Sequence, residues 1–329
     1  MLSPDPGEKP LVSAIVVTWN RPELLRECLR ALVAAGKEAG IPLEIIVVDN
    51  GSTAGDADVV EREFPGAELL RAEENLGFAR GVNWALERAL APSILLVNND
   101  VQVTSAALRE ACGLLVREPE LGVVGVRLVD PQGEPQISCG AFDTPARLMA
   151  EVVGLRALVR QRRADPSETG GGDWVAVDYV SGAFYLIRRV VIEQIGALDE
   201  RFYFYVEEAD WCLRARSAGW KTAHLPSASV VHHHGATTSG QAARSRLWLL
   251  ESRTRFVAKH YGRAWSLPIR LAALLGAGPL MLKGLAMVAV GRALGRITTA
   301  EAGRDRIERA WRGTRWAVSP RRECPEFWR

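Results

Sequence analysis

The residues of this sequence that are best able to do chemistry stand at the ends of apolar segments. Asn98, Asn99 and Asp100 directly follow the apolar segment 94–97, which reads Ile-Leu-Leu-Val. Such a segment is typical of a buried strand in a parallel sheet, and ligands of α/β proteins bind at the carboxyl ends of those strands. A carboxylate there needs a partner, so we predict that Asp100 binds a divalent cation. The alternative is an Asx turn that only closes the strand.

Polar residues also follow the first two apolar segments of the chain. Thr18, Trp19 and Asn20 come after the first, and Asp49 opens the sequence Asp-Asn-Gly-Ser after the second. In a parallel sheet these two ends lie side by side, where Asp49 would accept a hydrogen bond from the imide N–H of a nucleobase. The same residue types are the usual turn formers, so each motif taken singly is also consistent with a turn.

The elements that must position these residues alternate between strands and helices. Apolar periodicity predicts strands at 11–18, 43–48, 67–71 and 94–97, and helices at 22–35, 58–64, 78–90 and 105–117. A less regular region begins at 123–129, and further on we expect strands at 179–187 and 229–232 and helices at 190–195 and 209–218. This alternation implies βαβ crossovers and a mainly parallel sheet. The glycine-rich segment 165–172 is predicted to be a flexible loop that closes over substrate.

The composition is that of a globular protein, and the charge divides the chain in two. Of the 329 residues, 48% are hydrophobic and 24% charged, enough for one large core or two modest ones. Residues 1–240 hold 23 Lys and Arg against 33 Asp and Glu, whereas residues 241–329 hold 18 against 6, so the net charge of +2 combines an acidic body with a basic tail. We exclude nucleic acid as a partner because the acidic body offers no companion surface to the tail.

The cysteines and the N-terminus bear on the compartment. The five cysteines are scattered without a Cys-x-x-Cys pair, which indicates neither a disulfide framework nor a zinc cluster. The first ten residues lack the basic patch and apolar core of a signal peptide. We therefore expect a cytoplasmic protein.

The pattern of elements and the division of charge predict a leader at 1–10, an α/β domain at 11–240 and a basic helical C-terminal region at 241–329.

Four motifs in chain order resemble those of the family 2 glycosyltransferases, especially the rhamnosyltransferase-like branch with the GT-A fold. They are Val-Thr-Trp-Asn-Arg at 17–21, Val-Val-Asp-Asn-Gly-Ser at 47–52, Asn-Leu-Gly-Phe-Ala-Arg-Gly-Val-Asn at 75–83 and Leu-Val-Asn-Asn-Asp at 96–100. The resemblance covers roughly residues 11–240. It implies an α/β GT-A fold that binds a nucleotide sugar on a mainly parallel central sheet, followed here by a C-terminal helical extension.

The resemblance also implies which residues bind the donor and the metal. Those expected around the nucleotide-diphosphate donor are Thr18, Trp19, Asn20, Asp49, Asn75, Gly77, Arg80, Asn98 and Asn99. Asp100 is expected on the cation, which would be Mn²⁺ or Mg²⁺. Because Asn98 replaces the first acid of the family's metal motif, Asp100 is the only charged ligand that this motif offers.

An aromatic and acidic segment at 202–210, Phe-Tyr-Phe-Tyr-Val-Glu-Glu-Ala-Asp, resembles the one that carries the family's catalytic base. Glu208 aligns with that base, which removes the acceptor hydroxyl proton during inverting attack, and Glu207 and Asp210 stand beside it. Neighbouring carboxylates among aromatic rings would raise one pKa toward the working range. Glu207 is the alternative base, and an acidic helix N-terminus stabilised by the helix dipole is the structural alternative.

Three consecutive histidines follow the last predicted strand of the catalytic domain. The resemblance implies that His232 binds the metal or a phosphate. Because residues i and i+2 of an extended chain share a face, His234 is the second choice and His233 points elsewhere. A histidine run with loose metal affinity, or with none, is the alternative.

The basic tail contains an apolar stretch at 271–282 that Gly276, Gly278 and Pro279 interrupt. Twelve residues are too few to cross a bilayer, which needs about 20. The flanking arginines and tryptophans suit a helix that lies in the interface of an anionic membrane. The alternative is a helical layer packed on the catalytic domain or on a second copy of the chain.

Together these patterns predict a metal-dependent inverting glycosyltransferase. It would move a sugar, rhamnose as the first choice, from a dTDP- or UDP-sugar to a glycan or lipid-linked acceptor of the cell envelope, at the inner face of the membrane. A nucleotidyltransferase would need a Gly-rich basic loop after the first strand, which 18–22 does not supply. A non-catalytic scaffold would have no reason to keep Asp100, Glu208 and His232 together. A homo-oligomer is left open.

Overall fold

The computed structural model describes residues 9–153, 173–233 and 242–318, and these form two compact units. The first unit holds the described residues of Met1–Phe142 and Gln161–Ser239, and the second those of Asp143–Arg160 and Gly240–Arg329. The predicted loop 165–172 and His234 lie outside the described residues. The domain bounds at 10 and 240 remain a proposal.

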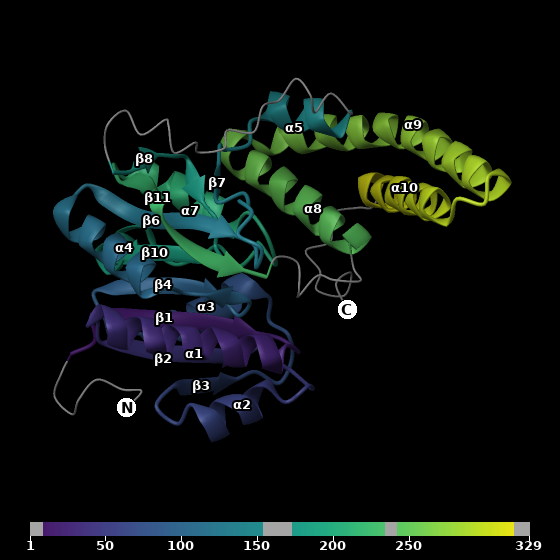
Figure 1. The fold of residues 1–329 in the computed structure, drawn as a ribbon. Helices are drawn as coiled ribbons and strands as arrows, with labels where there is room; N and C mark the ends of the chain where they lie inside the picture. The colour runs from purple at the N-terminus through teal and green to yellow at the C-terminus, as the bar shows by residue number, and fades with distance from the viewer. Residues whose placement is uncertain (1–8, 154–172, 234–241, 319–329) are drawn as a thin grey trace. The chain divides into compact units, whose positions relative to one another are not determined.

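The first unit is built on a nine-stranded sheet in the order β3-β2-β1-β4-β10-β6-β11-β5, with β8 paired to β11 (Figure 1). The strands are β1 (Val12–Thr18), β2 (Leu43–Asp49), β3 (Glu68–Arg71), β4 (Ser93–Asn98), β5 (Val101–Gln102), β6 (Leu121–Val129), β8 (Val175–Ala176), β10 (Phe184–Arg188) and β11 (Lys221–His232). Strands β1 to β4 run parallel, as do β6 and β11, and β10 lies antiparallel between β4 and β6. The predicted mainly parallel α/β sheet is confirmed.

Helices cover both faces of this sheet because the strand side chains alternate between them. Val12, Ala14 and Val16 of β1 point into the core shared with one set of helices, α1 (Pro22–Ala39), α2 (Asp56–Glu63) and α4 (Ser105–Arg117). Val17 points to the other face, beside Gly81 of α3 (Phe78–Leu86). Helices α6 (Arg189–Ile195) and α7 (Glu207–Ser217) also pack on that face. A separate small sheet consists of β7 (Cys139–Gly140) and β9 (Tyr179–Val180).

Two strand predictions were incomplete for identifiable reasons. β11 begins at Lys221 and not near 229, because a register shift between Leu225 and Ser229 accommodates Pro226, a residue that argues against a central strand. The single strand expected at 179–187 is divided into β9 and β10. The region expected to be irregular from 123 is β6, one of the longest strands of the sheet.

The second unit consists of helices α5 (Pro145–Val152), α8 (Ala242–Tyr261), α9 (Ser266–Ala293) and α10 (Ile297–Val318), with a short 3-10 turn before α9. Helix α9 continues through Gly276 and Pro279 and is longer than the twelve-residue apolar stretch seen in the sequence. An added Cβ at Gly276 would lie 2.7 Å from the carbonyl oxygen of Val152, so the glycine permits close packing of α5. By length and composition alone, Arg263–Ala293 would suffice to cross a membrane.

Candidate functional site

The ends of β1 and β4 are joined to helix α2 by a buried chain of hydrogen bonds. The Thr18 hydroxyl donates to Asp56 Oδ1 over 2.5 Å and accepts from Asn99 Nδ2 over 2.9 Å. All three side chains are buried. Asp56 was not predicted from the sequence, because no motif indicates its contact with Thr18, 38 residues away. The chain of bonds fixes Asn99, and with it the backbone that carries Asp100.

The turns after β1 and β2 are bonded to each other. Asn20, whose backbone has a positive φ of 54°, accepts hydrogen bonds at Oδ1 from the backbone N–H groups of Thr53 and Ala54, at 2.7 and 3.1 Å. The Asp49 carboxylate accepts from the Ser52 N–H at 2.9 Å. The predicted neighbourhood of these two strand ends is therefore present, with Trp19 partly exposed beside them.

A second cluster joins the segment that begins at Asn75 to the aromatic segment that contains Tyr203, 128 residues after Asn75. Asn75 Oδ1 accepts from Asn50 Nδ2 at 3.1 Å, from the Gly77 N–H at 2.9 Å and from the Tyr203 hydroxyl at 3.2 Å. The Phe78 N–H donates to the Tyr203 carbonyl oxygen at 3.0 Å. The motif that begins at Asn75 and the aromatic segment therefore lie in contact. The side-chain oxygen of Asn75 accepts its hydrogen bonds from donors within the protein.

Gly77 should be hard to replace for two separable reasons. Its φ is +85°, and an added Cβ would lie 2.8 Å from a ring carbon of Tyr203. Gly133 has the same φ of +85° but nothing within 4 Å. We expect Gly133→Ala to cost about 1–2 kcal/mol for its backbone. Gly77→Ala should cost about 1–3 kcal/mol more, because overpacking against Tyr203 adds to a backbone with ψ of 168°, a region that essentially only glycine adopts. Urea unfolding of both variants measures the difference; equal losses would contradict the contact with Tyr203.

Asp100 and His232 face each other at the carboxyl ends of β4 and β11. Asp100 Oδ1 lies 3.4 Å from His232 Nε2, and both side chains are buried. Gln136 Nε2 donates to the His232 carbonyl oxygen at 2.8 Å, which leaves Gln136 Oε1 to accept from His232 Nδ1 at 2.7 Å. With the proton on Nδ1, the lone pair of His232 is on the nitrogen that faces Asp100. His233 is turned to Gln102 instead.

The geometry of this pair fits two neighbouring ligands of one cation. Ligand atoms at about 2.1 Å from a metal ion, seen at 90–110° from each other, lie roughly 3.0–3.4 Å apart. A bond from the far ring nitrogen to a side-chain oxygen, as Gln136 provides, is the usual support of a metal-binding histidine. Within the described ranges, no group of three or more His, Cys, Asp or Glu side chains is placed to hold a metal ion. Asp100 and His232 would therefore need ligands from elsewhere.

Glu207 and Glu208 begin α7, directly after Tyr205 and Val206, whose φ values of 70° and 73° lie in the left-handed region. Such strain in β-branched and bulky residues gathers at functional sites. Glu207 is buried, and its Oε2 has no hydrogen-bond partner. Burial raises the pKa of Glu208 to about 7. Burial, and then the charge of Glu208, raises the pKa of Glu207 well above its ordinary value.

Arg80 and Asp210 have partners outside these clusters. The exposed Arg80 forms an ion pair with Glu200, with Nε and Oε2 3.4 Å apart. Asp210 is fully buried and accepts from Arg214 Nε at 3.1 Å. Asn98 ends β4, partly exposed, with its backbone N–H bonded to Ala183. The roles predicted for these three residues remain predictions.

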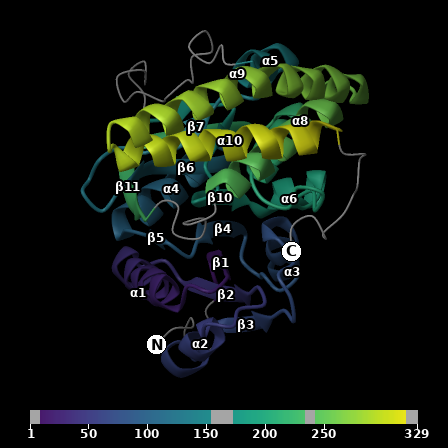
Figure 2. The same ribbon diagram turned by 90° about the vertical axis from the view of Figure 1, so that its right-hand side faces the viewer.

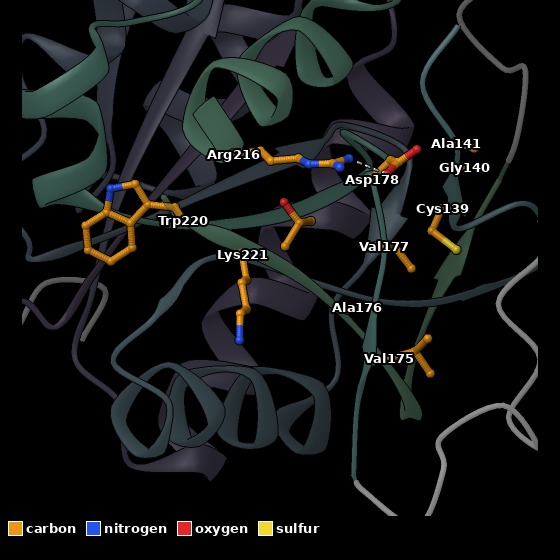
Figure 3. Close-up of a pocket in the computed structure, with 11 residues that line it drawn as sticks. Cys139, Gly140, Ala141, Val175, Ala176, Val177, Asp178, Arg216, Trp220 and Lys221 are labelled. Atoms are coloured by element: carbon orange, nitrogen blue, oxygen red, sulfur yellow. Dashed lines mark hydrogen bonds and ion pairs between the residues drawn. The ribbon is translucent and has the colours of Figure 1, made fainter. Parts of the chain in front are cut away.

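A cavity of about 320 Å³ opens elsewhere in the first unit, beside β7, β8 and the start of β11 (Figure 3). Arg216 and Asp178 form an ion pair at its wall, 3.0 Å apart, and Lys221 also lines it. Lys221 begins β11 and His232 ends it. Neither Asp100 nor His232 lines the cavity, so the cavity is distinct from the candidate site.

Comparison with known proteins gives a consistent result. The sequence profile of "Glycosyl transferase family 2" matches residues 13–195. The chain is 27% identical over 286 residues to the N-acetylglucosaminyl-diphospho-decaprenol L-rhamnosyltransferase of Mycobacterium tuberculosis, a match that covers 79% of this chain and 88% of that protein.

Two solved structures share the fold of this chain. The mannosyltransferase PcManGT from Pyrobaculum calidifontis, in complex with GDP-Man and Mn²⁺, has a TM-score of 0.56 at 18% identity over 97% of this chain and 90% of its own. GalNAc-T7 with UDP, GalNAc and Mn²⁺ has a TM-score of 0.52 at 14% identity over 68% of this chain and 44% of its own. At these identities the likeness shows the fold alone, which is the expected GT-A type.

Proposed function

The chain belongs to glycosyl transferase family 2 and is therefore a glycosyltransferase; on this premise we propose that it is a metal-dependent, inverting enzyme that uses a nucleotide-diphosphate sugar. The observation that carries the proposal is the pair of buried metal-ligand types, Asp100 and His232, facing each other across 3.4 Å with Gln136 behind the histidine. The pair lies at the carboxyl ends of β4 and β11, where α/β sheets bind their ligands.

In this proposal Asp100 and His232 would hold the cation together with ligands from outside the chain. Mn²⁺ suits a site that mixes imidazole and carboxylate, and Mg²⁺ is the alternative. When bound, the cation stabilises the negative charge that develops on the leaving diphosphate. The Mn²⁺ and nucleotides named for PcManGT and GalNAc-T7 support this assignment.

We assign the base to Glu208 rather than Glu207. Glu208 has a pKa of about 7 and is ionised for much of the time at neutral pH. Burial and the charge of Glu208 raise the pKa of Glu207, whose side chain is buried with no hydrogen-bond partner at Oε2. The acceptor hydroxyl gives its proton to the Glu208 carboxylate as its oxygen bonds to the anomeric carbon and the bond to the diphosphate oxygen breaks on the opposite face. Asp210 then acts as a positioning group for α7 through Arg214.

The donor-binding residues are proposed in two groups. Thr18 and Asn99 bond to each other, and Asn20 and Asp49 accept hydrogen bonds from backbone N–H groups of the turn after β2. Trp19 and Asn98 stand partly exposed beside these strand ends. Asn75 and Gly77 hold the neighbouring segment against Tyr203. Arg80 would reach the donor only on leaving Glu200.

For the substrates we propose rhamnose as the sugar, dTDP-rhamnose as the donor and a lipid-linked glycan precursor as the acceptor, at the cytoplasmic face of the membrane. The name of the Mycobacterium tuberculosis relative supports both the sugar and a polyprenyl-diphosphate acceptor.

A thermal-shift screen of nucleotide sugars with Mn²⁺ or with EDTA tests the proposal. A donor present at about 100 times its Kd stabilises the chain by about 2.7 kcal/mol, which corresponds to a Tm increase of roughly 5–10 °C in a domain of this size. We expect that increase for a dTDP-sugar with Mn²⁺ and little of it with EDTA. No shift with any nucleotide sugar, or equal shifts in both conditions, would contradict metal-dependent donor binding.

A further inference from the structure

Helix α9 exposes a continuous apolar stripe. Its leucines with the largest exposed fractions are Leu267 (64%), Leu271 (51%), Leu275 (75%), Leu282 (69%) and Leu285 (51%). At about 100° per residue these five side chains fall within roughly 80° of one another around the helix. Only 11% of the most apolar part of this segment is buried. An exposed apolar surface of this length marks a site of interaction with a partner or a membrane.

Helix α10 runs beside α9 along its whole length (Figure 2). Near the turn between them, an added Cβ at Gly291 would lie 2.6 Å from the Ala300 nitrogen, and one at Gly284 would lie 2.9 Å from the Gly303 carbonyl oxygen. At the other end, Arg270 donates to the Trp316 carbonyl oxygen over 3.1 Å. The two helices therefore form one antiparallel hairpin. Any position that α9 takes in a membrane also fixes the position of α10.

The charges of α10 decide how this hairpin meets a membrane. Its middle carries six ionised side chains, Arg304, Asp305, Arg306, Glu308, Arg309 and Arg312. If α9 crossed the bilayer, α10 would bring these groups into the hydrocarbon, where ionised side chains are costly even when paired. A hairpin that lies on the surface, with the leucine stripe facing the acyl chains, leaves them in contact with water and headgroups.

We infer that the α9–α10 hairpin docks on the surface of an anionic lipid bilayer, with the leucine stripe of α9 in the interface. The charge of the C-terminal region supports this partner, since residues 241–329 hold 18 Lys and Arg against 6 Asp and Glu. Lys283 and Arg292 are exposed on α9 itself. Cationic side chains beside an apolar stripe bind anionic headgroups while the stripe enters the interface.

The inference deepens the proposed function and rests on it for the lipid-linked acceptor. Its test measures binding without donor or acceptor. A failure of membrane binding is therefore distinguishable from a failure of the donor screen.

The test is co-sedimentation of the full chain with vesicles of phosphatidylcholine, with and without phosphatidylglycerol. We expect binding that needs phosphatidylglycerol and weakens as salt is raised. The triple variant Leu271→Ser/Leu275→Ser/Leu282→Ser should bind at least about tenfold more weakly, because each leucine loses its buried apolar area. The control, Leu90→Ser/Val116→Ser, removes two side chains of the first unit that are 75% and 80% exposed, and it should bind like the parent chain.

Four outcomes would overturn the inference. The first is a parent chain that does not bind anionic vesicles, a result that needs no variant. The second is a triple variant that has an unchanged circular dichroism spectrum and binds like the parent chain. Release from the vesicles only by detergent, after high salt and alkaline carbonate have failed, would mean that α9 crosses the bilayer. Dimers that the triple substitution dissociates, without vesicle binding by the parent chain, would assign the stripe to a second copy.

Discussion

Replacing Glu208 by glutamine is expected to lower kcat by about 10²–10⁴-fold, because the amide keeps the shape of the side chain and cannot take the acceptor proton. Donor affinity should stay near that of the parent enzyme. Steady-state kinetics, with donor affinity from calorimetry, separates the two effects. Glu87→Gln is the matched control, since Glu87 is exposed at the end of α3 and lies outside the proposed machinery.

The neighbouring Glu207 makes this prediction sharper. Burial and the charge of Glu208 raise the pKa of Glu207 and so favour its neutral form, which glutamine resembles. Glu207→Gln should therefore retain most of the activity. The reverse pattern, an inactive Glu207→Gln enzyme and an active Glu208→Gln enzyme, would transfer the role of base to Glu207.

The pH dependence follows from the same two carboxyl groups. Since Glu208 must be ionised to act as a base, kcat should rise with pH through about 7 in the parent enzyme. The pKa of Glu208 is raised from 4.5 on folding, so its contribution to stability is fully present below pH 4.5 and is lost as pH rises through about 7. Glu208→Gln should flatten both profiles. A parent pH–rate profile without a rise near neutrality would contradict the assignment.

Replacing Asp100 by asparagine is expected to abolish the part of donor affinity that depends on the cation. The substitution removes the only charged ligand of the proposed site, and loss of a mere supporting group of a metal site already costs about 10–100-fold in affinity. Calorimetric titration of the donor, with Mn²⁺ or EDTA, measures the loss. Asp173→Asn, at a side chain that is 81% exposed, is the control for the change of charge.

Replacing His232 by alanine should also lower the donor affinity that depends on the cation, whereas replacing His233 should not. His232→Ala removes the nitrogen that faces Asp100, whereas the His233 ring lies by Gln102, so His233→Ala should keep nearly normal affinity. If Asp100→Asn left donor binding intact and still sensitive to EDTA, the cation would have to bind at other residues.

The fold could be predicted because local pattern and tertiary structure agree over most of the first unit. The helix at 105–117 was predicted with the bounds that the structure has, since Thr104 caps it and its apolar face follows the helical period. The prediction failed where packing outweighs a local signal. Pro226 is absorbed by a register shift in β11, and Pro279 lies inside α9, whose neighbours hold it in one helix.

The candidate site was predictable in its residue types and not in its contacts. The motifs at 98–100 and 232 could be found one by one, but their meeting depends on β5 pairing with the end of β11. Asp56 and Gln136 gave no signal, because each acts through a partner 38 or 96 residues away. The pKa values of Glu207 and Glu208 are both raised by burial, which the sequence does not reveal.

The central claim is that this chain transfers a sugar from a nucleotide-diphosphate donor with the help of a cation. It is tested most directly by incubating the purified chain with labelled dTDP-rhamnose and a polyprenyl-diphosphate-linked N-acetylglucosamine, in Mn²⁺, in EDTA, and in EDTA followed by excess Mn²⁺. We predict a labelled lipid product with Mn²⁺, none with EDTA, recovery when Mn²⁺ is restored, and inverted configuration at the anomeric carbon. Transfer that proceeds equally well in EDTA, or with retained configuration, would contradict the account.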